Sequence, residues 1–136
     1  MEVNVEQATP TFVRLIVSLG DSQTRVDLSA DARMLEPTDT EFGVALSIEE
    51  LAVDKVLAIF GRAEARDFTD LVALQQRFGL PHLFRLAKQK DLGFDEDVFR
   101  QMLDRFDRLA RDEFDVDDET YIQVRTTVDQ WKTQTP

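Results

Sequence analysis

Residues 47–71 constrain the fold of this chain most strongly, because they carry the signals for two consecutive helices joined near Gly61. Ser47 followed by Glu50 is the pattern of a capping box, in which each side chain bonds to the other residue's backbone N–H and starts a helix. We expect this first helix to run to about Phe60 and to end where Gly61 adopts a left-handed conformation. The sequence therefore predicts a helical corner at this point of the chain.

Charged residues gather at this corner with helical spacing. Lys55 and Arg62 share one face of the first helix, and Arg66 and Asp70, four residues apart, share a face of the second. Asp67 lies three residues before Asp70 and either belongs to the same face or caps its helix. We expect these side chains to converge into one pocket that faces the strand hairpin. The same spacings are also typical of a solvated face held by weak ion pairs, and that alternative stays open.

This pattern resembles the C-terminal signature of the AbiEii/AbiGii-type nucleotidyltransferase toxin family. The resemblance extends from about Phe12 to Phe106 and includes Val26-Asp27-Leu28 and the segment 46–51. The family has a nucleotidyltransferase-like fold, and its active members transfer a nucleotide from a nucleoside triphosphate (NTP) to an acceptor such as tRNA. The residues that carry the signature are Asp54-Lys55-x-x-Ala58-x-x-x-Arg62-x-x-x-Arg66-Asp67-x-x-Asp70-Leu71.

The resemblance implies roles for these residues. Lys55 would neutralise the charge of the triphosphate, and Asp70 would act as a base or orient Lys55. Asp27, on a strand, would assist a Mg²⁺ ion, which prefers oxygen ligands and bridges carboxylates to phosphates. A lone strand aspartate is otherwise most often simply exposed to solvent. The residues implied in holding the nucleotide are Arg62, Arg66 and Asp67.

One element of the longer family members has no clear counterpart in this chain. It is a Gly-Ser turn followed by an acidic residue on the next strand, which grips the nucleotide and lies upstream of the signature. The chain therefore resembles the back two-thirds of the family, and we expect it to be inactive or weak by itself. The alternative is a noncatalytic remnant, or one half of a split pair, that binds a nucleotide or a protein partner. That partner would be an antitoxin or the missing N-terminal half.

Composition narrows the remaining classes of function. The chain has 136 residues, which is typical of a single globular domain, and it contains no cysteine, which fits a cytoplasmic protein. A net charge of −11 argues against nonspecific binding to DNA, because phosphate contacts need a basic surface. A local patch around Arg62 and Arg66 keeps RNA open as an acceptor. No apolar run approaches the roughly 20 residues that span a membrane.

The chain as a whole predicts an α+β fold in a single domain. Residues 1–46 are expected to form a sheet built on an antiparallel hairpin of Thr11–Leu19 and Gln23–Ser29 with an edge strand before it. The resemblance implies that this is a partial nucleotidyltransferase-like sheet. In this hairpin Asp27 lies on the polar face. Residues 47–136 form a bundle of about five helices. The second helix is expected to end near Phe78, and the third to run from Pro81 to about Lys90. The fourth helix is expected to start near Asp95 and the last near Asp118. We expect His82 to lie on the surface, not in a catalytic site.

Overall fold

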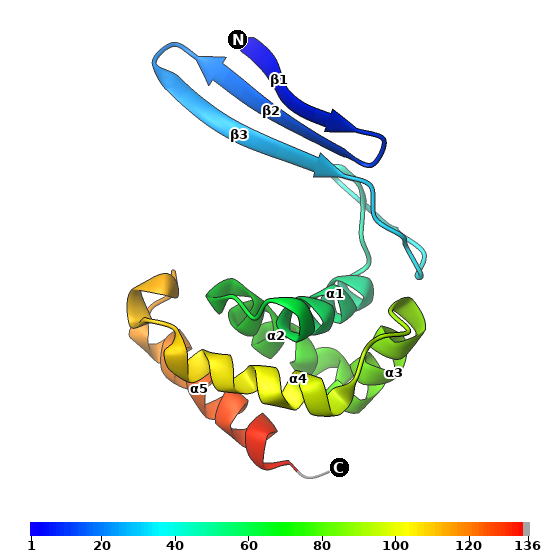
Figure 1. Ribbon diagram of the computed structural model, residues 1–136, viewed down its shortest axis with the longest axis vertical. Helices are drawn as coiled ribbons and strands as arrows, with labels where there is room; N and C mark the ends of the chain where they lie inside the picture. The colour runs from blue at the N-terminus through cyan, green and yellow to red at the C-terminus, as the bar shows by residue number, and fades with distance from the viewer. Residues whose placement is uncertain (135–136) are drawn as a thin grey trace. The chain divides into compact units, whose positions relative to one another are not determined.

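The computed structural model describes residues 1–134 and divides the chain into two compact units, Met1–Arg33 and Met34–Pro136. The first unit is a three-stranded antiparallel sheet with the strand order β1-β2-β3 (Figure 1). Its strands are β1 (Glu2–Thr9), β2 (Phe12–Leu19) and β3 (Ser22–Ser29). The predicted hairpin and the edge strand before it are therefore confirmed.

The register of the sheet separates its two faces. Leu15 pairs with Val26 and Val13 pairs with Leu28, so their side chains share one apolar face. Arg14, which lies between them on β2, pairs with Asp27 on the opposite face. The period of two along each strand thus places Asp27 on the polar face, as the sequence predicts.

The second unit begins with a small hairpin and continues as helices, which confirms the α+β fold with about five helices. The first strand of this small hairpin is only three residues long, too short for a recognisable alternation in the sequence. The elements are β4 (Thr38–Thr40), β5 (Gly43–Ala45), α1 (Ile48–Gly61), α2 (Ala65–Phe78), α3 (Leu80–Lys90), α4 (Glu96–Met102), the 3₁₀ helices η1 (Leu103–Arg108) and η2 (Arg111–Glu113), and α5 (Asp118–Thr133).

The corner between α1 and α2 differs from the sequence prediction in its left-handed residue. The N–H groups of Arg62 and Ala63 both donate to the carbonyl of Ala58, at 2.8 and 3.0 Å, so the helical turn continues past Gly61. The left-handed conformation falls on Ala63, whose φ is 54°. The prediction for Gly61 was wrong, because the backbone turns only where these bonds to Ala58 end.

At the start of α1, one of the two hydrogen bonds of the predicted capping box is present. The Ser47 hydroxyl accepts a hydrogen bond from the Glu50 N–H at 3.1 Å. The Glu50 carboxylate does not complete the predicted capping box. It is fully buried and accepts hydrogen bonds at 2.8 Å from the N–H groups of Met34 and Leu35 and from the Lys90 ammonium. Three donors from elsewhere in the unit thus outcompete the single local N–H.

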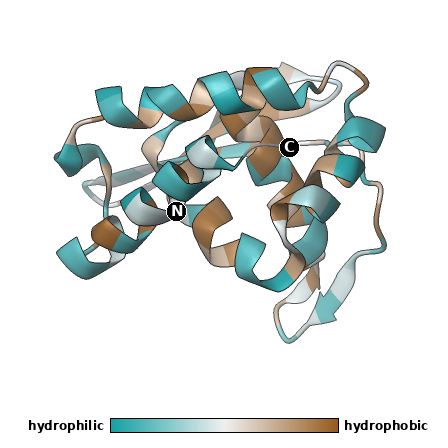
Figure 2. Ribbon diagram, turned by 90° about the horizontal axis from the view of Figure 1, so that it is seen from below, coloured by the Kyte–Doolittle hydropathy of each residue, from teal (hydrophilic) through white to brown (hydrophobic). Residues whose placement is uncertain are grey.

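Aromatic side chains form much of the core of the helical unit. Phe84 and Phe99 meet with ring centroids 4.9 Å apart, and Phe68 and Phe106 meet at 5.2 Å, both edge to face. Phe114, in the linker before α5, is also buried. Figure 2 shows the hydrophobic stretches of the helices lying mainly toward the middle of this unit, with hydrophilic stretches outside. Within residues 1–134, no helix is long and apolar enough to cross a membrane.

Candidate functional site

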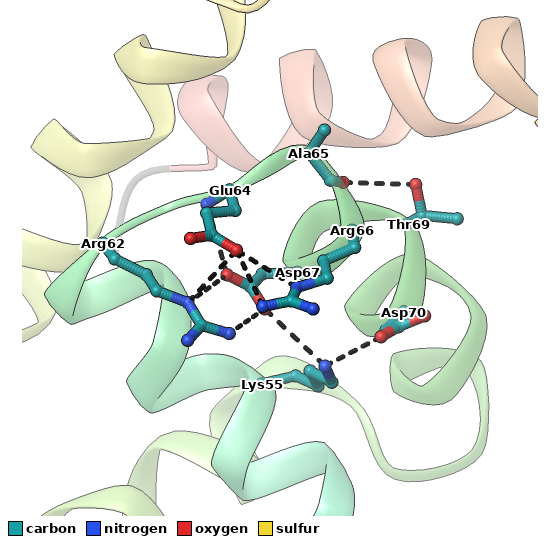
Figure 3. A network of polar contacts seen from close by, with 8 residues as sticks. All are labelled: Lys55, Arg62, Glu64, Ala65, Arg66, Asp67, Thr69 and Asp70. Carbon is teal, nitrogen blue, oxygen red and sulfur yellow. Dashed lines mark hydrogen bonds and ion pairs between the residues drawn. The ribbon is translucent and has the colours of Figure 1, made fainter. Parts of the chain in front are cut away.

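The turn at Ala63 brings the end of α1 against the start of α2, and the predicted charged residues meet there (Figure 3). Lys55 projects from the middle of α1 and Arg62 follows its last turn. Asp67 and Asp70 lie in the first two turns of α2. These side chains converge as the sequence predicts, and their facing the strand hairpin stays a prediction.

Asp67 is the centre of this cluster and is fully buried. Its two carboxylate oxygens accept hydrogen bonds from Nε and Nη2 of Arg62, both at 3.0 Å, and one of them also accepts from the Glu64 N–H at 3.2 Å. Burial by itself would raise the pKa of Asp67, but these hydrogen bonds and the nearby cations Arg62 and Lys55 lower it below its ordinary value. Asp67 therefore stays ionised. It holds the Arg62 guanidinium and the backbone at Glu64 in place.

Lys55 bridges two carboxylates. Its ammonium lies 2.8 Å from Asp70 and 3.6 Å from Asp67. The Lys55 side chain is 18% exposed, whereas the Asp70 side chain is 46% exposed. The contact with Asp70 is the one expected of a residue that orients Lys55. Lys55 is thus a partly buried cation beside a carboxylate that is open to solvent.

Arg66 does not contact Asp70 in the structure, although the two share a helical spacing. It pairs with Glu64, with Nε at 3.1 Å and Nη2 at 3.0 Å from one carboxylate oxygen. The same oxygen lies 3.7 Å from Nε of Arg62. Glu64 was missed from sequence, although an acidic residue just before a helix with an aspartate three residues later is a signal for such a position. An open hollow of about 390 Å³ lies here, lined by Glu64, Ala65, Arg66 and Glu113.

Asp27 belongs to the sheet unit and has its own partners there. Both of its oxygens accept hydrogen bonds from Arg14, at 2.7 and 2.9 Å, and Arg25 lies at 3.8 Å. The hydrogen bond from Arg14 lowers the pKa of the Asp27 carboxyl. Two guanidinium groups beside one carboxylate disfavour a divalent cation, so the residues around Asp27 do not fit Mg²⁺ in this arrangement. The predicted role of Asp27 in assisting a Mg²⁺ ion stays a prediction.

Other titratable groups lie outside this cluster. His82 is partly exposed at the surface, as the sequence predicts, and its Nε2 contacts the Glu49 carboxylate. In the part of the chain that the structure describes, no group of three or more His, Asp or Glu side chains is arranged to hold a metal ion. Of the predicted site residues, those of the helical unit gather at the corner, whereas Asp27 lies in the sheet unit.

A family model described as "Nucleotidyl transferase AbiEii toxin, Type IV TA system" matches residues 6–132, which is most of the chain. The chain belongs to the AbiEii nucleotidyl transferase toxin family. The resemblance drawn from the corner residues is thereby confirmed.

A solved structure supports the same fold for this AbiEii-family chain. This chain is similar to the crystal structure of JHP933 from Helicobacter pylori, with a TM-score of 0.53 and 18% sequence identity. The similarity covers 97% of this chain and 63% of JHP933, so the chain spans less than two-thirds of the length of that protein. At this level of identity the likeness concerns the fold alone. No protein with a curated description matches the chain significantly.

Proposed function

We propose that this chain acts in nucleotide transfer of the AbiEii toxin type, from an NTP to an acceptor such as tRNA, and that it is weak or inactive alone. The observation that carries the proposal is the position of the Lys55 ammonium, held between Asp67 and Asp70. A lysine fixed in this way offers one positive charge in a defined place, which suits recognition of phosphate oxygens. Family membership supports the same reaction class.

Each residue of the corner has a role in this proposal. Lys55 would move from Asp70 toward a triphosphate and neutralise part of its charge. Asp70, half exposed and released from Lys55, would accept the proton of the acceptor hydroxyl as that oxygen attacks the α-phosphorus and pyrophosphate leaves. Asp67 would keep Arg62 in place. Arg66 is the most exposed cation of the cluster and would contact phosphate from the solvent side.

The charge balance of the corner explains why the activity is expected to be weak. The cations Lys55, Arg62 and Arg66 are matched by three carboxylates, which belong to Glu64, Asp67 and Asp70. A triphosphate would have to compete with these carboxylates for every cation. The same neutrality favours the second candidate function, a noncatalytic module in which the corner is structural and the chain binds a nucleotide or a protein partner. An additional positive charge or a metal–phosphate complex would be needed for tight nucleotide binding.

The test is incorporation of labelled nucleotide into a tRNA pool in the presence of magnesium. The unchanged protein is compared with Lys55→Ala and with the control Lys132→Ala, which removes a lysine paired to Asp107 on another part of the unit. Circular dichroism checks that all three proteins are folded. Nucleotide binding is measured in parallel by isothermal titration calorimetry.

Incorporation that is lost in Lys55→Ala and kept in Lys132→Ala supports nucleotide transfer at the corner. Equal incorporation by both variants would place the reaction elsewhere and refute the roles assigned to the corner residues. If the unchanged protein incorporates nothing and binds NTP equally well with and without Lys55, the noncatalytic interpretation replaces the proposal. Binding that disappears only with Lys55→Ala would assign the corner to nucleotide binding without transfer.

A further inference from the structure

The helical unit contains a second cavity that shares no residue with the charged corner. Its volume is about 450 Å³, within the range of sites that hold small organic ligands. It lies between α3, α4 and the end of α5. Among the residues that line it are Phe84, Arg85, Glu96, Phe99, Arg100 and Trp131.

The floor of this cavity is aromatic. Phe84, Phe99 and Trp131 are 7%, 1% and 5% exposed. The Phe84 and Phe99 rings pack against each other edge to face. These side chains belong to the buried core, so the cavity is preformed and needs no rearrangement to accept a flat apolar body. An aromatic ring packed against such a floor gains contact area together with favourable ring geometry.

The charged side chains at the cavity favour an anion. Arg85 and Arg100 both line it, against a single carboxylate, Glu96. Glu96 is already held by Lys88, whose ammonium lies 3.0 Å from one of its oxygens. The carboxylate oxygens nearest to Arg100 belong to Asp97, at 3.5 Å, and to Glu96, at 3.9 Å. Both are too far for strong hydrogen bonds. The cavity therefore has a positive rim in a chain whose net charge is −11.

We propose that this cavity is a binding site for a small planar aromatic molecule that carries one anionic group. The ring lies on the floor of Phe84, Phe99 and Trp131, and the anionic group accepts hydrogen bonds from Arg85 and Arg100, whose planar donors suit carboxylate and phosphate geometry. The site stands apart from the charged corner, so it does not depend on nucleotide transfer there.

The test uses 1-naphthoate as the probe, with the neutral 1-naphthalenemethanol and the cationic 1-naphthylmethylammonium as matched analogues. Binding is measured by isothermal titration calorimetry and by the fluorescence of Trp131, the single tryptophan of the chain. An acidic protein without a specific site attracts the cation most. We expect the opposite order, with 1-naphthoate binding one molecule per chain and tighter than both analogues.

Variants locate the site. Arg100→Gln and Arg85→Gln should each weaken 1-naphthoate binding by about fivefold or more. The control Arg105→Gln removes an exposed arginine of η1 outside the cavity and should leave the affinity unchanged. The three variants have the same net charge, and circular dichroism confirms that they fold. No saturable binding of 1-naphthoate, a preference for the cation, or equal affinity in all three variants would overturn the proposal.

Discussion

Replacing Glu50 by glutamine should destabilise the helical unit more than neutralising any other carboxylate of α1. Glu50 is fully buried and accepts hydrogen bonds from two backbone N–H groups, those of Met34 and Leu35, and from the Lys90 ammonium. The Lys90 side chain is only 9% exposed and also contacts Asp54. Glutamine keeps one acceptor oxygen but turns an N–H donor toward groups that are themselves donors.

The pKa of Glu50 gives the size of this effect. Burial by itself would raise it, but the hydrogen bonds from Lys90, Leu35 and Met34 lower it from 4.5 to about 2. Such a fall corresponds to about 3 kcal/mol of stability at neutral pH. Asp54 shares the Lys90 charge and is 25% exposed, and screening by solvent on that side reduces the figure to about 2 kcal/mol. This stabilisation is fully present above about pH 4.5 and is lost as the pH falls toward 2.

Urea unfolding followed by Trp131 fluorescence measures the effect, because Trp131 lies in the core of the same unit. Glu49→Gln is the matched control, since the neighbouring Glu49 is 33% exposed and its partner is the surface residue His82. We expect Glu50→Gln to lose about 2 kcal/mol at pH 7 and the control less than about 1 kcal/mol. The difference between Glu50→Gln and the unchanged protein should shrink between pH 4.5 and pH 2. Equal losses in both variants, or a difference that is independent of pH, would refute the argument.

Three further substitutions test the helical unit by the same urea assay. Ser47→Ala removes the hydroxyl that caps α1 and should cost about 1 kcal/mol, and no loss would contradict the cap. Phe99→Ala empties a fully packed aromatic position and should cost about 3–5 kcal/mol; a loss below about 1 kcal/mol would show that the core there is not packed as described. Asp67→Asn leaves Arg62 without its buried partner and should cost about 3 kcal/mol, against less than about 1 kcal/mol for the half-exposed Asp70→Asn control; equal losses would remove Asp67 from the centre of the corner.

The helices and strands could largely be predicted from sequence, because their signals are local. The alternation of Val26, Asp27 and Leu28 fixes which strand face each occupies, and the Gly79–Leu80–Pro81 break ends one helix and begins the next. The spacing of Lys55, Arg62, Asp67 and Asp70 also placed these residues at one corner. These residues also carry the resemblance to the family, which the family-model match confirms.

Partner choice among the charged groups could not be predicted in the same way. Arg66 and Asp70 have the spacing of an ion pair, yet Arg66 pairs with Glu64 and Asp70 with Lys55, because the turn at Ala63 decides which side chains are within reach. Glu50 likewise leaves its local capping partner for Lys90, which is 40 residues away in sequence.

The sequence by itself therefore determined the order of the elements, the apolar faces and the residues at the corner, since periodicity and capping act over a few residues. Only the tertiary structure decided which charges are buried and which pairs form. The reason is physical: the cost of burying a charge depends on all the donors and acceptors that packing brings around it, and these come from distant parts of the chain.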